Sequence, residues 1–164
     1  MKEYGLDLSK HNGIVDFNAI KKAGNSFVIL RAGYGTSTKD TKFEEYYKQA
    51  KESGLKVGAY WYSYALNKEQ AKQEAKKFLE VVKGKKFEYP LFLDMEDADG
   101  YKKKNGMPSN STLVDICNTF CKEVESKGYY VGIYASESWF KNQIKGVADG
   151  CYDIWLANWG NNNA

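Results

Sequence analysis

Short, almost wholly apolar segments alternate with longer amphipathic segments along the whole chain. The apolar segments have the length of β-strands and are rich in Val, Ile, Leu and aromatic residues, which is typical of strands buried on both faces. They span Tyr4–Ser9, Phe27–Gly33, Lys56–Tyr64, Tyr89–Glu96, Tyr129–Ala135 and Asp153–Trp159.

The amphipathic segments between them predict helices, because their apolar residues recur with a helical period. These helices are expected over Asp16–Ala23, Asp40–Ser53, Asn67–Lys83, Ser111–Lys127 and Ser138–Lys145. Gly54 and Gly128 follow two of them, where C-terminal caps are common, and Asn67 and Gln70 have the spacing of a capping box. The strict alternation of strand and helix predicts a parallel sheet covered by helices.

Polar and aromatic side chains gather at the ends of the predicted strands, which is where α/β proteins place their function. An open, doubly wound sheet would collect such groups at one switch point, whereas a barrel collects them from many strands. The spread over all strands therefore favours a TIM-like β/α barrel in a single domain, residues 1–164. The residues concerned are Asp7, Arg31, Tyr60, Tyr62, Asp94, Glu96, Tyr134, Trp155 and Asn158.

Composition narrows the classes of partner. The chain has 164 residues, 43% of them hydrophobic, and a net charge of +3. That charge is too small to indicate nucleic acid, and no apolar run is long enough to cross a membrane. The first residues lack the apolar block of a signal peptide. A cytoplasmic protein released at lysis and a secreted protein whose leader is absent both agree with this, so the location stays open.

The sharpest chemical signal is the pair Asp94 and Glu96. Residues i and i+2 of a strand point to the same face, so the two carboxylates project together while Leu93 and Met95 pack on the other side. Two close carboxylates raise each other's proton affinity, so one can stay protonated while the other is ionised. Cleavage of a glycosidic bond needs such a pair. The alternative is a strand that ends in solvated acidic loop residues, and Asp7 on another strand end favours catalysis.

Aromatic residues make up 15% of the chain, and several of them stand at the same strand ends. Sugar rings have apolar faces and polar edges, which suit flat amphipathic side chains. Tyr60, Tyr62, Tyr134 and Trp155 are therefore candidate carbohydrate-binding residues, and Trp159 adds a further aromatic ring. For any single aromatic residue, packing in the core is the competing interpretation.

Several motifs together resemble family 25 of the glycoside hydrolases, which are lysozymes of bacteria and phage endolysins. The resemblance covers nearly the whole chain in the same order. The motifs are Gly5–Ser9 (GLDLS), Phe27–Gly35 (FVILRAGYG), Gly58–Tyr62 (GAYWY), Phe92–Glu96 (FLDME), Gly132–Tyr134 (GIY) and Ile154–Ala157 (IWLA).

The resemblance implies a modified eight-stranded barrel with fewer outer helices than usual. It also implies cleavage of the β-1,4 bond from N-acetylmuramic acid to N-acetylglucosamine in peptidoglycan. By matching position, Glu96 is the general acid/base, and Asp94 is the nucleophile or the residue that orients the substrate's 2-acetamido group. Asp7 is then a supporting carboxylate. Arg31, at the end of its predicted strand, is a candidate substrate-binding residue.

The resemblance also implies two further strands after the predicted strand that ends at Trp159, the last of them with another acidic residue. A sheet that stops at that strand has two open edges of unpaired backbone groups. Three arrangements remain: a fragment, strands supplied by a partner chain, or a rearranged open sheet. We expect the chain to self-associate through these edges.

Other signals are weaker. His11 is the only histidine, and it indicates a surface loop or a rim position near substrate. Cys117 falls on the apolar stripe of its helix and predicts core packing. The lysines at 83, 85, 86 and 102–104 predict solvated loops. The acidic residues after Leu93 lack calcium-loop spacing, so no metal and no cofactor is expected.

The sequence thus predicts a peptidoglycan glycosidase with Glu96 and Asp94 as the working pair. The main alternative is a non-catalytic module that binds cell-wall glycan through the same aromatic rim. A different hydrolase on an open α/β sheet is a weaker alternative, because His11 would be its only histidine partner for a nucleophile.

Overall fold

The computed structural model describes residues 2–150 and 152–157, and a single sheet runs through this part of the chain. Every neighbouring pair along its main path is parallel. The strands on this path are β1 (Gly5–Leu8), β2 (Phe27–Tyr34), β4 (Lys56–Tyr62), β5 (Leu91–Asp94), β6 (Val131–Ser136) and β7 (Asp153–Ala157). The predicted strands are therefore confirmed, except that Asn158 and Trp159 lie outside the described residues.

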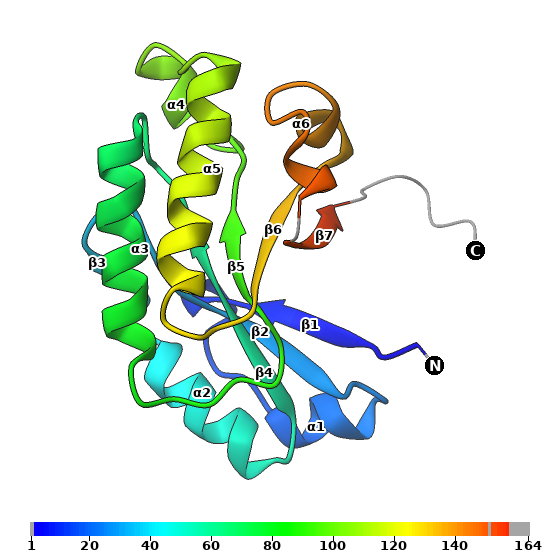
Figure 1. Ribbon diagram of the computed structural model, residues 1–164. Coiled ribbons are helices and arrows are strands. Elements are labelled where there is room, and N and C mark those ends of the chain that lie inside the picture. Colours follow the sequence, from blue (N-terminus) through cyan, green and yellow to red (C-terminus); the bar gives the residue numbers. More distant parts are fainter. Residues whose placement is uncertain (1, 151, 158–164) are drawn as a thin grey trace.

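The spatial order of these strands is their order in the sequence, β1-β2-β4-β5-β6-β7. A doubly wound sheet reverses direction at a switch point, and no such reversal occurs along this path. The sheet is instead a curled parallel half-barrel with α2 (Phe43–Glu52), α3 (Lys68–Val82) and α5 (Asn110–Glu125) along one side (Figure 1). Within the described residues, β1 and β7 each pair with one neighbour, so they form the two edges.

The helices of the predicted alternation are confirmed: α1 (Phe17–Lys22), α2 (Phe43–Glu52), α3 (Lys68–Val82), α5 (Asn110–Glu125) and α6 (Glu137–Lys141). Their ends follow the predicted capping. The Asn67 Oδ1 atom accepts a hydrogen bond from the Gln70 amide at 2.9 Å, and Gly54 and Gly128 have positive φ. The short helix α4 (Tyr101–Lys104) and the single turns η1 (Lys10–Asn12) and η2 (Val147–Asp149) were not predicted.

The two faces of the sheet have different neighbours. On the outer face, Trp61 packs on Phe78 of α3, which in turn contacts Phe120 of α5, with ring centroids 5.5 and 5.9 Å apart. The predicted core position of Cys117 is confirmed, because it is fully buried on α5. Because side chains alternate along a strand, Tyr60, beside Trp61, points to the opposite, inner face. The outer face supplies the hydrophobic core.

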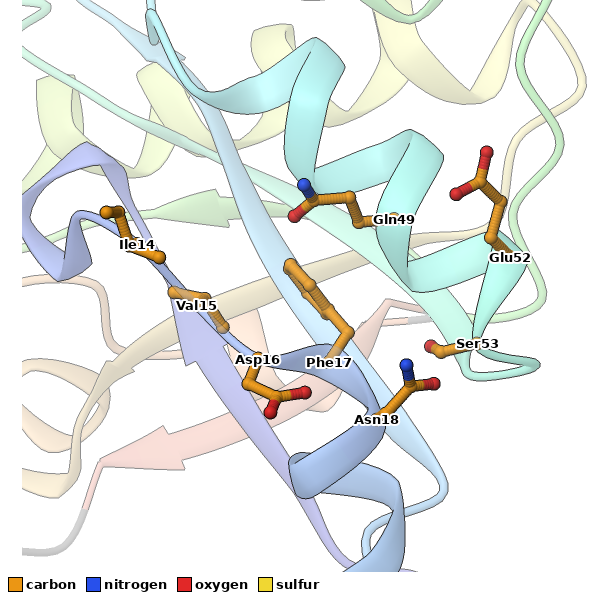
Figure 2. Close-up of a pocket in the computed structure, with 8 residues that line it drawn as sticks. All are labelled: Ile14, Val15, Asp16, Phe17, Asn18, Gln49, Glu52 and Ser53. Carbon is orange, nitrogen blue, oxygen red and sulfur yellow. The ribbon is translucent and has the colours of Figure 1, made fainter.

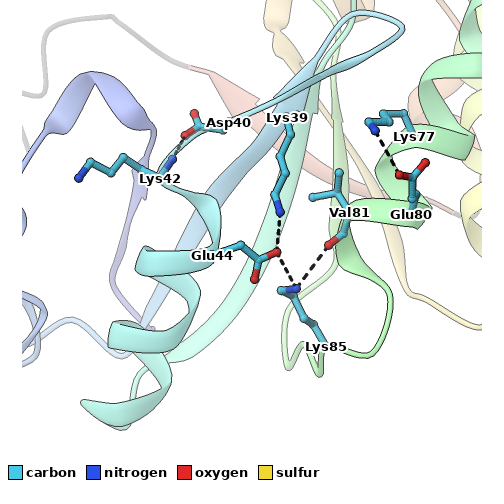
Figure 3. Close-up of polar contacts among 8 residues, drawn as sticks. All are labelled: Lys39, Asp40, Lys42, Glu44, Lys77, Glu80, Val81 and Lys85. Atoms are coloured by element: carbon cyan, nitrogen blue, oxygen red, sulfur yellow. Dashed lines mark hydrogen bonds and ion pairs between the residues drawn. The ribbon is translucent and has the colours of Figure 1, made fainter.

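Exposed ion pairs link the helical layer to the strands and loops. Lys85, after α3, donates to the Glu44 carboxylate of α2 at 2.9 Å, and Lys39 donates to the same carboxylate at 2.8 Å (Figure 3). Lys85 also approaches the Val81 carbonyl oxygen at 3.5 Å. Exposed pairs of this kind contribute about 0–1 kcal/mol each. They therefore add little to the stability of the fold.

A tight hairpin follows β2 and was not predicted, since its second strand, β3 (Thr38–Lys39), has only two residues. The strands pair antiparallel, with Gly33 opposite Lys39, and the β2–β4 register shifts between Arg31 and Gly33. A Cβ at Gly33 would lie 2.2 Å from the Thr38 carbonyl oxygen and 2.5 Å from the Trp61 ring. Only glycine therefore allows this close approach.

The change Gly33→Ala is expected to lower the free energy of unfolding by about 2 kcal/mol, because the new methyl group must displace backbone and a buried ring. Urea unfolding measures the effect, with the exposed Ser37→Ala of the same hairpin as the control. A Gly33→Ala protein as stable as the unmodified protein would contradict the close packing.

Candidate active site

One register row across four strands forms the centre of the site. Tyr62 pairs with Asp94, Asp94 with Tyr134, and Tyr134 with Trp155. These residues therefore stand side by side on β4, β5, β6 and β7. Their side chains share the inner face, which the helices leave uncovered.

All eight residues predicted for the site line a single pocket of about 230 Å³. Ser9 and His11, which follow β1, join them in its wall. The structure therefore brings together side chains from six strands and the loops after them, and their individual roles stay predictions. The predicted residues are Asp7, Arg31, Tyr60, Tyr62, Asp94, Glu96, Tyr134 and Trp155.

The strand that carries the carboxylate pair is shorter than predicted. β5 ends at Asp94, and Glu96 lies two residues beyond it. The Met95 amide still donates to the Tyr134 carbonyl oxygen at 2.9 Å, which holds the backbone near the β6 edge. Leu93 and Met95 are both fully buried. The predicted alternation therefore holds past the end of the regular strand.

Asp94 is the most buried acid of the pocket, with 7% of its surface exposed. Burial raises its pKa well above the usual range, and a side-chain hydrogen bond with Glu96 and the charge of Glu96 raise this pKa further. The positive charge of Lys102 lowers the pKa of Asp94. A hydrogen bond that raises the pKa of an acid is one in which that acid donates the proton. Asp94 therefore binds a proton more readily than an exposed aspartate does.

Asp7 enters the same pocket from β1. Although its side chain reaches solvent, partial burial raises its pKa, and the charge of Glu96 adds to this. A hydrogen bond from its own backbone amide works against the shift. Three carboxyl groups thus influence one another across the half-barrel, which is typical of acid–base chemistry.

Arg31 is held by an acid that the sequence analysis did not single out. Its Nε atom donates to Asp40 Oδ2 at 2.8 Å, and Asp40 is 1% exposed. Asp40 also accepts hydrogen bonds from the backbone amides of Lys10 and Lys42, at 3.1 and 2.9 Å; Figure 3 shows the second of these. The Nη2 atom of Arg31 is buried without a hydrogen-bond partner in the described structure, which leaves a donor for a ligand.

Trp155 is the centre of the aromatic wall. Its ring contacts those of Tyr134, Phe92 and Tyr60 edge to face, with centroids 4.7, 5.2 and 6.2 Å apart. Burial raises the pKa of Tyr60, Tyr62 and Tyr134, and the neighbouring carboxylates raise it further. The three hydroxyl groups therefore stay protonated at neutral pH and can donate hydrogen bonds.

One sequence expectation about this region is wrong. Lys102, predicted in a solvated loop, is fully buried beside the site. Its ammonium group donates hydrogen bonds to backbone carbonyl groups inside the protein. A run of three lysines gives no sign of which side chain points inward. Glu74 was also missed, but a signal existed: it lies three residues after Ala71 and four before Phe78, on the apolar stripe of α3.

Another hollow lies between the segment before α1 and the end of α2, lined by residues that include Ile14, Phe17 and Gln49 (Figure 2). It shares no lining residue with the carboxylate pocket. Within residues 2–150 and 152–157, no three His, Cys, Asp or Glu side chains are grouped as metal ligands. None of the described helices is long and apolar enough to cross a membrane.

Curated relatives with sequence similarity are lysozymes. The chain is 27% identical over 156 residues to the autolytic lysozyme of Clostridium acetobutylicum, covering 95% of this chain and 45% of that protein. It is 26% identical over 162 residues to lysozyme M1 of Streptomyces globisporus, covering 95% and 54%. The chain thus spans about half the length of these relatives.

Solved structures share the fold. A family 25 glycosyl hydrolase from Bacillus anthracis superposes with a TM-score of 0.82 at 23% identity, over 94% of this chain and 70% of that one. The catalytic domain of endolysin ply40, from bacteriophage P40 of Listeria monocytogenes, gives 0.79 at 27% identity, over 98% and 75%. The model of the family "Glycosyl hydrolases family 25" matches residues 6–164. The chain therefore belongs to glycosyl hydrolase family 25.

Proposed function

We propose that the chain is a lysozyme that hydrolyses the β-1,4 bond between N-acetylmuramic acid and N-acetylglucosamine in bacterial peptidoglycan. The observation that carries the proposal is the buried Asp94 carboxyl, which lines one pocket with Glu96 and an aromatic wall. Family membership and the lysozyme and N,O-diacetylmuramidase names of the relatives support the choice of substrate.

Glu96 is the general acid and base in this proposal. It is more accessible than Asp94, so it can reach the glycosidic oxygen of a polymer that enters from solvent. In this proposal the two carboxyl groups share one proton, which Asp94 holds in the free pocket and Glu96 holds when substrate is bound. Glu96 then protonates the leaving oxygen and later takes a proton from the attacking water.

Once that proton has moved, Asp94 is an anion beneath the sugar. It then either attacks the anomeric carbon or orients the 2-acetamido group, whose oxygen attacks instead; both routes keep the configuration at the anomeric carbon. Asp7 supports the positive charge that develops on the sugar. The free Arg31 donor and the tyrosine hydroxyls bind the polar edges of the glycan, and Trp155 contacts its apolar face.

The change Glu96→Gln is expected to lower the release of new reducing ends from purified cell walls at least about 100-fold, because it removes the transferred proton. Binding to insoluble walls should stay near that of the unmodified protein, since the amide keeps the size of the side chain.

The matched control is Glu69→Gln, at an exposed position in the first turn of α3, which should leave the rate unchanged. Near-normal turnover in the Glu96→Gln protein would refute the assignment. Wall binding without turnover in the unmodified protein would instead favour a glycan-binding module.

The raised pKa of Asp94 also predicts that the free energy of unfolding depends on pH. Its pKa is higher in the folded protein than the ordinary value of 3.8, so folding takes up a proton. Stability therefore falls as pH rises from about 4 through the raised pKa. The Asp94→Asn protein lacks this cost, so it should melt at a higher temperature at neutral pH. Its free energy of unfolding there should be higher by on the order of 1 kcal/mol or more.

Thermal unfolding from pH 4 to pH 8 measures this difference. The gap between Asp94→Asn and the unmodified protein should close on acidification, while the exposed Asp115→Asn of α5 serves as the control. A gap that is constant with pH, or a less stable Asp94→Asn protein at neutral pH, would contradict the buried, protonated state of Asp94.

We also propose that a second copy of the chain covers the two sheet edges. Leu6 of β1 and Ile154 and Leu156 of β7 are 43%, 41% and 48% exposed. Each strand pairs on one side within the described residues, so backbone donors and acceptors stand free beside apolar side chains. Such edges favour pairing with another strand.

Light scattering of the purified chain should therefore give a mass above one protomer, and Leu156→Lys should shift it toward the monomer. Ile14→Lys, at an exposed apolar position before α1, is the control. A monodisperse monomer at all concentrations would refute self-association.

A further inference from the structure

A fully buried ammonium group lies beside the carboxylate pair. Lys102 is 0% exposed, whereas Lys103 and Lys104 of the same short helix are exposed. The Lys102 Nζ atom donates to the Ser63 carbonyl oxygen at 2.6 Å and to the Glu96 carbonyl oxygen at 2.7 Å. Burying an ammonium costs several kcal/mol unless close partners compensate, so these contacts are essential to its placement.

The two carbonyl groups belong to different parts of the site. Ser63 directly follows β4, one residue after Tyr62, and Glu96 follows β5. A single ammonium therefore joins the ends of two neighbouring strands. The Nζ atom also lies 5.9 Å from the centre of the Tyr62 ring, so it contacts the pocket wall as well as the backbone of Glu96.

Further acids fix this arrangement from outside the pocket. Asp97 accepts hydrogen bonds from the backbone amides of Lys102 and Lys103, at 2.7 and 3.0 Å, which anchors the start of α4. Glu74 of α3 accepts from the Ser63 hydroxyl at 2.6 Å and from the Tyr64 amide at 2.8 Å. The Lys102 side chain thus enters a site whose backbone is held by Glu74 on one side and by Asp97 on the other.

We propose that Lys102 is a positioning residue for catalysis: its ammonium fixes the backbone of Glu96 against β4 and places a positive charge beside Asp94. The inference rests on the proposed function, because it assigns Lys102 a part in the same proton transfer. Lys102 itself contacts no substrate, since it is fully buried.

The electrostatic part of the argument has a definite sign. A positive charge stabilises the Asp94 anion, so Lys102 lowers the pKa that burial and Glu96 raise. It thereby favours passage of the shared proton from Asp94 to Glu96, the direction that general-acid catalysis needs. Burial in turn lowers the pKa of Lys102 and raises that of Glu74 to about 7.

Charged and titratable groups face these two side chains from every neighbouring element. Around Lys102 they are Glu74 of α3, Asp94 of β5, Asp97 and Asp99 of the following loop, Tyr62 of β4 and Cys117 of α5. Around Asp94 they are Asp7, Tyr60, Tyr62, Glu96, Lys102 and Tyr134.

The test compares Lys102→Met and Lys102→Gln with the control Lys103→Met. All three remove one positive charge from α4, but only the first two remove the buried ammonium. We expect the titration of the Asp94 carboxyl carbon, followed by NMR, to move to higher pH in both Lys102 variants. We also expect kcat to fall about 10- to 100-fold, as for small displacements of a catalytic group.

The Lys103→Met protein should keep the Asp94 titration and the kcat of the unmodified protein. Lys102→Gln retains an amide NH2 group that can donate to a carbonyl group, so it provides the measurement if Lys102→Met does not fold. An unchanged Asp94 titration in a folded Lys102 variant would overturn the inference. Failure of both variants to fold would also overturn it, because Lys102 would then serve stability alone.

The NMR titration needs no enzymatic activity, which separates this inference from the proposed function. If the unmodified protein releases no reducing ends while the Asp94 titration still moves in the Lys102 variants, the proposed lysozyme activity fails and the coupling of Lys102 to Asp94 stands. If activity is present and the titration does not move, the positioning role alone fails.

Discussion

The hydrogen-bond register between β4, β5, β6 and β7 is the constraint on which the site depends. It places Tyr62, Asp94, Tyr134 and Trp155 in one row, and a shift by a single residue in any strand would turn its side chain toward the helices. The same alternation commits Trp61, Leu93 and their neighbours to the core. Packing of the outer face therefore fixes the chemistry of the inner face.

The site concentrates groups that are costly to bury. Asp94 keeps an Oδ1 atom without a hydrogen-bond partner within the described residues, and so does Arg31 at Nη2. An unsatisfied buried polar atom costs about 1–3 kcal/mol, and this cost is recovered when a ligand with polar edges supplies the missing partners. The buried Lys102 and Glu74 beside the pocket hold the surrounding backbone in place during that exchange.

Much of this arrangement follows from the sequence alone. The alternation of apolar and amphipathic segments predicted the strands and the main helices, since both periodicities are strong in β/α units. The rule that function gathers at strand ends predicts that Asp7, Asp94 and Tyr134 lie close together, and all three line one pocket. The boundary of β5 was less predictable, because Glu96 continues the alternation of the strand without its regular hydrogen bonds.

The parts that sequence could not supply depend on contacts distant along the chain. Asp40 reaches Arg31 only because the two-residue strand β3 turns the chain back. Lys102 lies 39 residues from its Ser63 partner, in a run of lysines that is typical of an exposed loop. Neither pairing produces a periodic pattern in the sequence. Glu74, in contrast, lies on the apolar stripe of α3 and could have been predicted as buried.

The most direct test of the central claim is mass spectrometry of the soluble products that the purified chain releases from bacterial cell walls. Fragments that end in reducing N-acetylmuramic acid are the predicted result, because the proposed reaction cleaves the β-1,4 bond from N-acetylmuramic acid to N-acetylglucosamine. Fragments that end in reducing N-acetylglucosamine, or no soluble fragments from a folded protein, would contradict the account.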